Sequence, residues 1–429
     1  RFSAILAGLA FELTPKLFAH WAAGHVTLCY AYSITPWLLL CESYSISKRG
    51  WRWVGCTAIV LGLILLADVR WAAYAGLCWI SFRAYKFLGR ENRIAAWFDW
   101  GIKSMSVVLL AALLAAPFLL DFLEFTSLST RVGMSSLDRS KFGLPLNQLI
   151  GILYPDFGGY TEWIFYPGAI GLTLIVMQLT SRNGWKQNWY WLFLVISSLI
   201  LAMDAGWIDA IPGLNLLRVS SRFLFLFNLA SAILIGKGFD KIFLQKQDRP
   251  LPPISWLVGA GVSFLAILLP LLILIMTESI PTEMVWGMAF FTISFTTLIM
   301  GKYVTKYSSS IKYIFLVIVV ADLGGAGFSQ IRWVQNSVVD QDGLRIANIF
   351  DKLGANGRIY SSNYQIPQLS SERMNLQMIS GIDPMQLNAF ALFMERATNI
   401  KLSEYSVPIP PLNEDPISKS NLGIVPEAD

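Results

Sequence analysis

The sequence predicts an α-helical polytopic membrane protein with about eleven transmembrane helices. Hydrophobic residues make up 55% of the 429 residues and charged residues only 14%, whereas soluble domains carry roughly 25% charged residues. Apolar stretches of about 20 residues, the length that crosses a bilayer, recur along most of the chain. The 16 Trp and 15 Tyr residues are typical of aromatic belts at the two membrane interfaces.

The predicted spans follow one another with short loops between them. They lie near residues 1–17, 26–44, 53–68, 71–88, 97–122, 166–181, 187–203, 220–238, 253–276, 283–300 and 311–329. Every second loop is basic, and by the positive-inside rule these loops face the cytoplasm. The rule places on the outer face residues 18–25, 123–165, 204–219, 277–282 and everything after about 330.

The chain divides into two predicted domains. Residues 1–329 form the transmembrane domain, with a long outer loop at 123–165, and residues 330–429 are richer in Asn, Gln, Ser and charge. Residues 357–361 read as the start of a strand and 385–398 as an amphipathic helix, which predicts the start of an extracytoplasmic α/β domain. Because the chain opens inside an apolar run and stops in a Pro-rich stretch, we expect a fragment that lacks both ends.

Several classes of function are disfavoured. The net charge of +5 gives a poor signal for nucleic acid, because the basic residues gather in short loops between helices. The four cysteines lie in apolar N-terminal segments, where small buried hydrophobes are expected, and no Cys/His spacing predicts zinc. No cofactor is identified, and a divalent metal has no support from the sequence.

An arginine pair stands at the start of an apolar helix on the predicted outer side. Arg218 and Arg222 are four residues apart and therefore share a helix face. A guanidinium suits bidentate contact with phosphate, and the free N–H groups of the helix start would add to an anion site. Arg131, in the long outer loop, is a further candidate for lipid phosphate. The alternative is that the pair extends to lipid headgroups.

Carboxylates on the same side are candidates for contacts with a sugar or acceptor. Asp121 and Glu124 are three residues apart, and a carboxylate there would act as a base or bind hydroxyl groups, unless the segment is an ordinary solvated helix end. Asp156, Tyr160 and Glu162 mix carboxylates with aromatic rings, which suits sugar recognition; the alternative is a glycine-containing turn with interfacial aromatics.

The only two histidines, His20 and His25, lie in one predicted outer loop. A spacing of five does not put them on one helix face, and a metal site would need further ligands, so we expect hydrogen bonds to a substrate or to backbone. Asp322 lies in the last predicted span, where we expect it to pair with an outer arginine.

These motifs, in their order, resemble the YfhO-type bacterial multi-pass membrane proteins of the GT-C-like glycosyltransferase group. The resemblance covers most of the chain and rests on Ala19–His25 with Pro36-Trp37, Ala116-Pro117 with Leu123-Glu124 and Ser129–Arg131, Leu149–Gly158 with Tyr166–Gly168, Ile211–Arg222, Ala321–Leu323, and Gly357-Arg358 with Gly381–Pro384. Ser221 stands where the family has proline, and Pro167 where isoleucine is common. The family's catalytic acid lies in a first outer loop that we place upstream of Arg1, so the catalytic residue is unknown.

The resemblance implies a multi-pass protein of the cell membrane that works with membrane lipid. It would transfer a sugar from a polyprenyl-phosphate donor to a cell-envelope acceptor on the outer face. Two other classes stay open at this point. One is a transporter or flippase for a lipid-linked or anionic solute, although no inverted repeat is visible. The other is a non-catalytic scaffold of envelope assembly.

Overall fold

A computed structural model describes residues 1–48, 50–88, 94–130, 142–156, 160–203, 217, 219–244, 252–303, 308–331, 333, 345, 348–350, 357–360, 368–379, 381–382, 385–399 and 408–409. The chain forms two compact units. Residues 1–115 and 142–331 make the first unit, and residues 116–141 and 332–429 make the second. The long loop predicted over 123–165 is thus divided between the two units.

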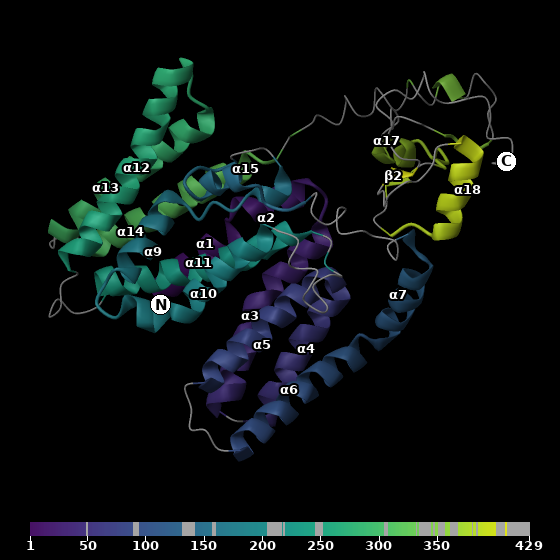
Figure 1. Cartoon of the computed structure of the whole chain (residues 1–429), viewed down its shortest axis with the longest axis horizontal. Coiled ribbons are helices and arrows are strands. Elements are labelled where there is room, and N and C mark those ends of the chain that lie inside the picture. Colours follow the sequence, from purple (N-terminus) through teal and green to yellow (C-terminus); the bar gives the residue numbers. More distant parts are fainter. Residues whose placement is uncertain are drawn as a thin grey trace. The chain divides into compact units, whose positions relative to one another are not determined.

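The regular secondary structure described in the first unit is helical (Figure 1). Its α-helices are α1 (Phe2–Glu12), α2 (Pro15–Ala22), α3 (Val26–Lys48), α4 (Trp51–Ala67), α5 (Val69–Leu88), α6 (Ile94–Leu114), α9 (Ala169–Leu179), α10 (Gly184–Ala202), α11 (Leu224–Phe239), α12 (Pro253–Thr277), α13 (Thr282–Tyr303), α14 (Ser308–Val319) and α15 (Gly325–Phe328). Shorter 3-10 and π-helical turns are η2 (Leu146–Ile152), η3 (Thr161–Trp163), η6 (Ser220–Phe223), η7 (Asp240–Leu244) and η9 (Val320–Gly324).

Five helices in the described part of the chain are long and apolar enough to cross a membrane. They are Phe2–Ala22, Ala96–Leu114, Ser220–Phe243, Pro253–Thr277 and Thr282–Met300. The helices Trp51–Ala67 and Ala169–Leu179 are apolar but shorter. The chain is therefore helical and has apolar helices of the kind found in membrane-embedded proteins. This agrees with the predicted class of helical membrane protein.

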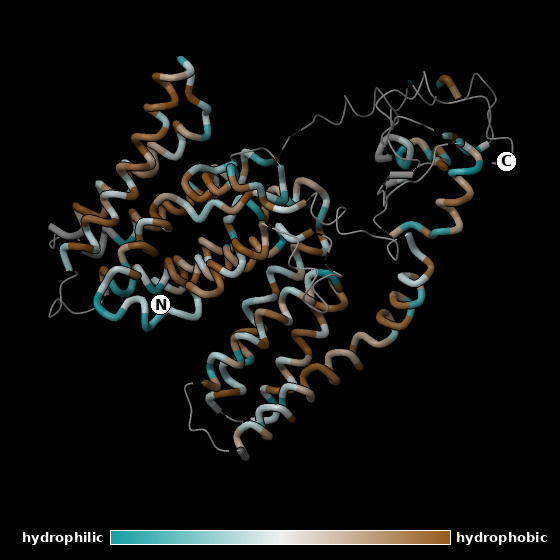
Figure 2. The backbone as a smooth tube through the Cα atoms, in the orientation of Figure 1, coloured by the Kyte–Doolittle hydropathy of each residue, from teal (hydrophilic) through white to brown (hydrophobic). Residues whose placement is uncertain are grey.

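Helix α11 lies at the centre of one part of the first unit, packed against α1, α9 and α10. In the candidate span Ser220–Phe243, which contains α11, 83% of the most apolar stretch is buried inside the protein. The same share in α12 is 22%. Helix α12 instead exposes large apolar side chains such as Leu257, Ile275 and Met276, and Figure 2 shows this helix as largely hydrophobic along its length. Apolar residues that are exposed in this way suit a helix that faces lipid. Helices α3, α4, α5 and α6 pack on one another as a second group.

The span predicted over 97–122 is shorter in the structure. Helix α6 ends at Leu114, and α7 (Ala116–Leu128) begins after a turn at Ala115 and belongs to the second unit. Pro117 explains the break, because proline lacks the backbone N–H that would continue the hydrogen-bond ladder and its ring clashes with the preceding turn.

In the described part of the second unit, the helices and strands are α7, α17 (Gln368–Arg373), α18 (Asn388–Thr398) and two short strands. Strand β1 (Gly381–Ile382) pairs antiparallel with β2 (Pro408–Ile409). A small core forms around Ile379, Ala391 and Met394. Helix α18 falls inside the predicted amphipathic segment, while strands of two residues do not establish the predicted α/β domain.

Candidate functional site

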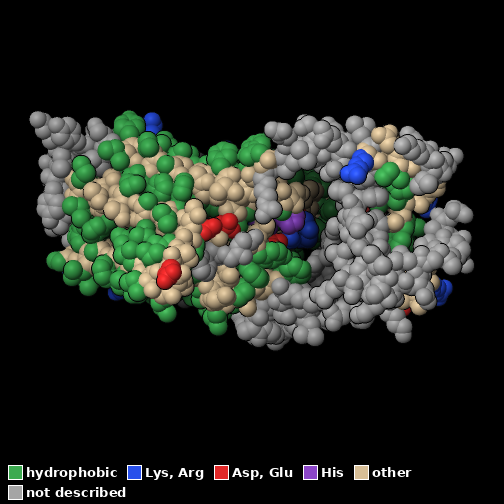
Figure 3. Space-filling view, turned by 90° about the horizontal axis from the view of Figure 1, so that it is seen from above, with side chains coloured by type: hydrophobic (Ala, Val, Ile, Leu, Met, Phe, Trp, Pro, Cys, Tyr) green, Lys and Arg blue, Asp and Glu red, His purple; other side chains and the backbone are tan. Residues whose placement is uncertain are grey.

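A polar cluster lies inside the first unit where four segments meet. Lys16 and His20 come from α2, His25 from the turn after it, Glu162 from η3 and Arg222 from η6. We call these five residues the Glu162 cluster. In sequence order its members span more than 200 positions, so only folding brings them together. Figure 3 shows a histidine side chain with basic and acidic side chains beside it in a hollow of this view, and His25 is the half-buried member of the cluster.

The turn after α2 brings the two histidines together. Pro15 starts α2, a position where its fixed φ suits a helix and its missing N–H costs no bond. At the other end Gly24 adopts φ +77°. The N–H of Gly24 donates to the carbonyl of Trp21, and that of His25 to the carbonyl of His20. This is the Schellman arrangement of a helix end, which folds the sixth residue back onto the first. His20 and His25 occupy those two positions.

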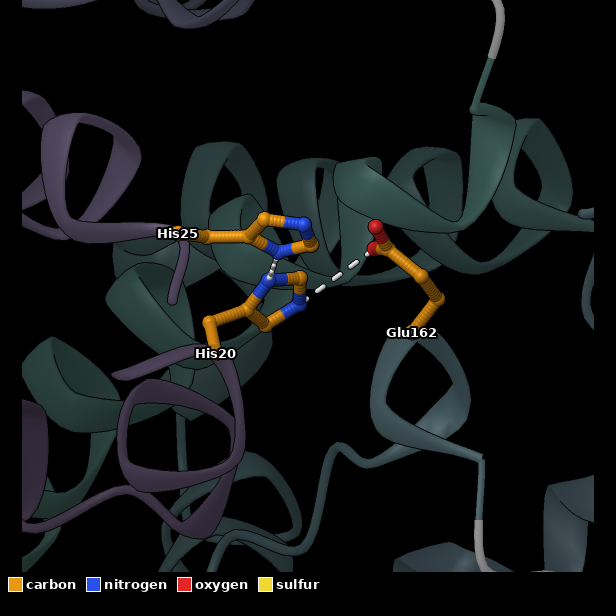
Figure 4. Close-up of side chains that lie close together, drawn as sticks. All are labelled: His20, His25 and Glu162. Atoms are coloured by element: carbon orange, nitrogen blue, oxygen red, sulfur yellow. Dashed lines mark hydrogen bonds and ion pairs between the residues drawn. The ribbon is translucent and has the colours of Figure 1, made fainter. Parts of the chain in front are cut away.

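Glu162 is the centre of the cluster. Its Oε1 accepts hydrogen bonds from Nε and Nη2 of Arg222 at 3.1 and 3.0 Å. Its Oε2 lies 3.3 Å from Nε2 of His20, and its backbone carbonyl accepts a hydrogen bond from Nζ of Lys16 at 2.7 Å. Nδ1 of His20 and Nδ1 of His25 are 2.8 Å apart. Figure 4 shows the line that runs from Glu162 through His20 to His25.

The cluster is buried, and it holds two basic side chains beside one carboxylate. Lys16 and His20 are 0% exposed, Glu162 3% and Arg222 7%. Burial alone would raise the pKa of the Glu162 carboxyl, but His20, Arg222 and Lys16 hold that pKa well below its usual value. Glu162 is therefore ionised beside the guanidinium of Arg222 and the amine of Lys16. An ion without a counter-charge in such a place is costly.

A second ion pair stands beside His25. Asp68, between α4 and α5, accepts hydrogen bonds from the Arg70 guanidinium, from two backbone N–H groups at the start of α5 and from Thr27 Oγ1. These bonds make it the N-cap of α5. Burial and then Arg222 lower the pKa of the His25 imidazole, with Arg70 acting in the same direction and Glu162 and Asp68 against it. His25 is therefore neutral near pH 7.

A metal is the first ligand to consider for these side chains. His20, His25 and Glu162 can each offer a ligand atom, and those atoms lie within 4.8 Å of one another. Two imidazoles and one carboxylate are a ligand set that zinc accepts. However, Lys16 and Arg222 both donate to Glu162, and the charge of the Arg222 guanidinium opposes a divalent cation at this place. Two basic side chains around one carboxylate favour an anion instead.

Of the other predicted site residues, two lie outside the described part of the chain and four lie within it. Arg131 and Arg218 lie outside the described residues, so the predicted arginine pair is described only for Arg222. Tyr160 stands near the cluster in sequence and makes an edge-to-face contact with Trp163 at 4.9 Å between ring centroids. Asp156 has a left-handed backbone with φ 48°. The remaining two, Asp121 and Glu124, are exposed on α7 in the second unit.

The sequence analysis did not select Lys16 for the site, although a signal was present. Lys16 and His20 are four residues apart on a helix and therefore share a face. The spacing of five between the histidines does not fit one helix face, but it does fit the turn at Gly24, which the prediction left out. Asp322 differs from expectation as well. Among the described residues its partners are neutral donors: Tyr166 Oη, Ala169 N and Trp286 Nε1.

The low pKa of Glu162 predicts how stability depends on pH. The carboxyl binds its proton less readily in the folded protein than in the unfolded chain, whose value is near 4.5. Its contribution to stability is therefore complete above about pH 4.5 and is lost as the pH falls through the folded-state pKa. We expect the melting temperature of the wild type to fall more steeply on acidification than that of Glu162→Gln, measured by tryptophan fluorescence in detergent. Parallel curves would contradict this prediction.

Comparison with known proteins does not identify a family. No protein-family model matches the chain, and no curated protein sequence matches it significantly. The residues of the Glu162 cluster and the helical architecture around them are therefore the basis for a proposed function.

Proposed function

We propose that the protein is a multi-pass membrane protein, of about eleven spans, that transfers a sugar from a polyprenyl-phosphate donor to a cell-envelope acceptor on the outer face of the membrane. In this proposal the Glu162 cluster holds the phosphate of the donor. The observation that carries it is the buried arrangement of two basic side chains, Lys16 and Arg222, around the single carboxylate of Glu162.

Lys16 is the basic side chain that an anionic ligand would engage. Its Nζ donates to the backbone carbonyl of Glu162, which is uncharged, and lies 4.9 Å from the centroid of the Phe225 ring. The carboxylate of the same residue is already engaged by Arg222 and faces His20. An anionic ligand would balance the remaining charge, and a phosphate group suits both a lysine ammonium and an arginine fork.

The surroundings support a ligand with an apolar tail. The cluster lies where the candidate spans Phe2–Ala22 and Ser220–Phe243 meet η3. Its neighbour Phe225 also contacts the ring of His20, at 4.8 Å between centroids. A phosphate carried by a polyprenyl chain would place its charged group at the cluster and its tail along apolar helices. Tyr160 and Trp163, on either side of Glu162 in the sequence, are aromatic groups of the kind that stack on sugars.

Replacing Lys16 by methionine tests this proposal. The change removes a buried amine and leaves the pair of Arg222 and Glu162 intact, so the folded protein should keep or gain thermal stability. Binding of a polyprenyl phosphate in phosphatidylcholine nanodiscs should weaken by about 10-fold or more, because a hydrogen bond to a charged group contributes roughly 1.5–3 kcal/mol. The measurement is a binding titration followed by tryptophan fluorescence.

The controls are a neutral lipid and a distant lysine. The neutral polyprenol should bind wild type and Lys16→Met alike, and Lys186→Met, at an exposed lysine of α10, should bind the phosphate like wild type. Equal binding of phosphate and alcohol by the wild type would overturn the phosphate role. A transporter or flippase would use the same anion site but would move the lipid without forming a glycosylated product, so product analysis separates the two functions.

A further inference from the structure

The tautomers of the two histidines can be read from their partners. Glu162 is ionised, so its Oε2 only accepts hydrogen bonds. Nε2 of His20 faces this oxygen at 3.3 Å, and within the described chain neither atom has a hydrogen-bond partner. Nε2 of His20 must therefore carry the proton, because two lone pairs that face each other would repel.

The second nitrogen of His20 then determines the state of His25. A positive charge on His20 beside the Arg222 guanidinium and the Lys16 amine is unfavourable in a fully buried place, so His20 is neutral and its Nδ1 is an acceptor. Nδ1 of His25 lies 2.8 Å from it and must be the donor. A neutral imidazole carries one proton, which leaves a free lone pair on Nε2 of His25.

We propose that Glu162, His20 and His25 form a hydrogen-bonded relay whose outer end, Nε2 of His25, removes a proton from a hydroxyl group of the acceptor. The inference rests on the proposed sugar transfer and adds to it the group that activates the acceptor. The half-buried ring of His25 stands at the accessible end of the chain, and Glu162 at the buried end.

In this step each bond that forms is matched by a bond that breaks. The acceptor O–H bond breaks and its proton goes to Nε2 of His25, while the oxygen forms a bond to the anomeric carbon of the donor sugar. The bond from that carbon to the phosphate oxygen breaks, and the phosphate leaves with the electron pair beside Lys16 and Arg222. As His25 gains a proton at Nε2, its Nδ1 proton can shift to Nδ1 of His20. The positive charge is then shared between the two imidazole rings and is stabilised by Glu162, which stays ionised and which Arg222 holds in place.

The charged groups around His25 permit this role. Arg222 and Arg70 from η6 and the start of α5 disfavour its protonation, while Glu162 and Asp68 favour it. Because burial adds to the arginines, the ring is neutral at neutral pH and able to accept a proton. The rate of transfer should therefore rise with pH as His25 loses its proton and then level off.

Nitrogen NMR tests the relay directly, since the chain contains only two histidines. Protein labelled with ¹⁵N-histidine in nanodiscs should show one ring protonated at Nε2, assigned to His20, and one protonated at Nδ1, assigned to His25 by its loss in His25→Gln. Two rings protonated at Nε2, or a positively charged ring at neutral pH, would overturn the relay. Coordination of added Zn²⁺ by both rings would overturn it too, because the lone pair of His25 would then be occupied.

Kinetics test the use of the relay. His25→Gln should lower kcat by about 100-fold or more, the usual contribution of a general base, and leave the KM for the donor unchanged. His20→Gln should flatten the pH profile as well as lower kcat, because it removes the link to Glu162. Normal kcat in His25→Gln would overturn the role of base. Expected tautomers in a wild type without transfer would contradict the proposed function, whereas wrong tautomers in an active protein would contradict the relay alone.

Discussion

Glu162→Gln is expected to destabilise the folded protein by about 3–5 kcal/mol, the cost of removing one partner from a buried ion pair. The substitution keeps the shape of the side chain and removes its charge. Lys16 and Arg222 are then left together in a place where both are almost fully buried. Thermal unfolding in detergent, followed by tryptophan fluorescence, measures the effect.

Two further variants separate charge from shape. In the double variant Glu162→Gln with Lys16→Met, only Arg222 remains charged, so part of the lost stability should return. Glu278→Gln, at an exposed carboxylate after α12, should melt like the wild type. If Glu162→Gln alone melts at the wild-type temperature, then the cluster is not the charged centre of the folded protein, and the argument for a phosphate ligand fails with it.

Asp322→Ala is expected to have the next largest effect, a loss of about 3–5 kcal/mol. The carboxylate of Asp322 is 0% exposed and accepts from Tyr166 Oη, the backbone N–H of Ala169 at 2.7 Å and Trp286 Nε1. It therefore joins η9 to the start of α9 and to α13. Alanine would leave these donors without an acceptor in a buried place, and each such donor costs roughly 1–3 kcal/mol.

Smaller changes at the same place should give graded losses. Asp322→Asn keeps one acceptor oxygen, so its melting temperature should lie between those of wild type and Asp322→Ala. Trp286→Phe removes only the indole donor and leaves Oδ1 with Tyr166, so it should cost the least of the three through hydrogen bonding. An alanine variant as stable as the asparagine variant would mean that water replaces the lost carboxylate.

The helices and their lengths could be predicted because their causes are local in the sequence. Apolar composition and helix length are properties of short segments, and each segment predicted as a span contains a described helix. Five of these meet the length and composition needed to cross a membrane. The break at Pro117 was also readable from a single residue, although the sequence analysis predicted one helix across it.

The candidate site was only partly predictable. Lys16 and His20 share a helix face by their spacing, and the turn at Gly24 brings His25 back onto His20 through a local hydrogen-bond pattern. A closer reading of the sequence would have joined these three residues. Glu162, which stands opposite them, carries no such local signal, and Asp121, Glu124 and Asp156 were as plausible from the sequence.

The amino-acid sequence is enough to derive a helical chain with helices long and apolar enough to cross a membrane. It also gives a basic and a histidine side chain on one face of α2 and an arginine at the start of the α11 span. That these residues meet around Glu162 follows from the tertiary structure alone, because its contacts with Lys16 and Arg222 join positions 146 and 60 residues away. A buried carboxylate is stable only where folding supplies cations and donors from other segments. No pattern within a short segment encodes that arrangement.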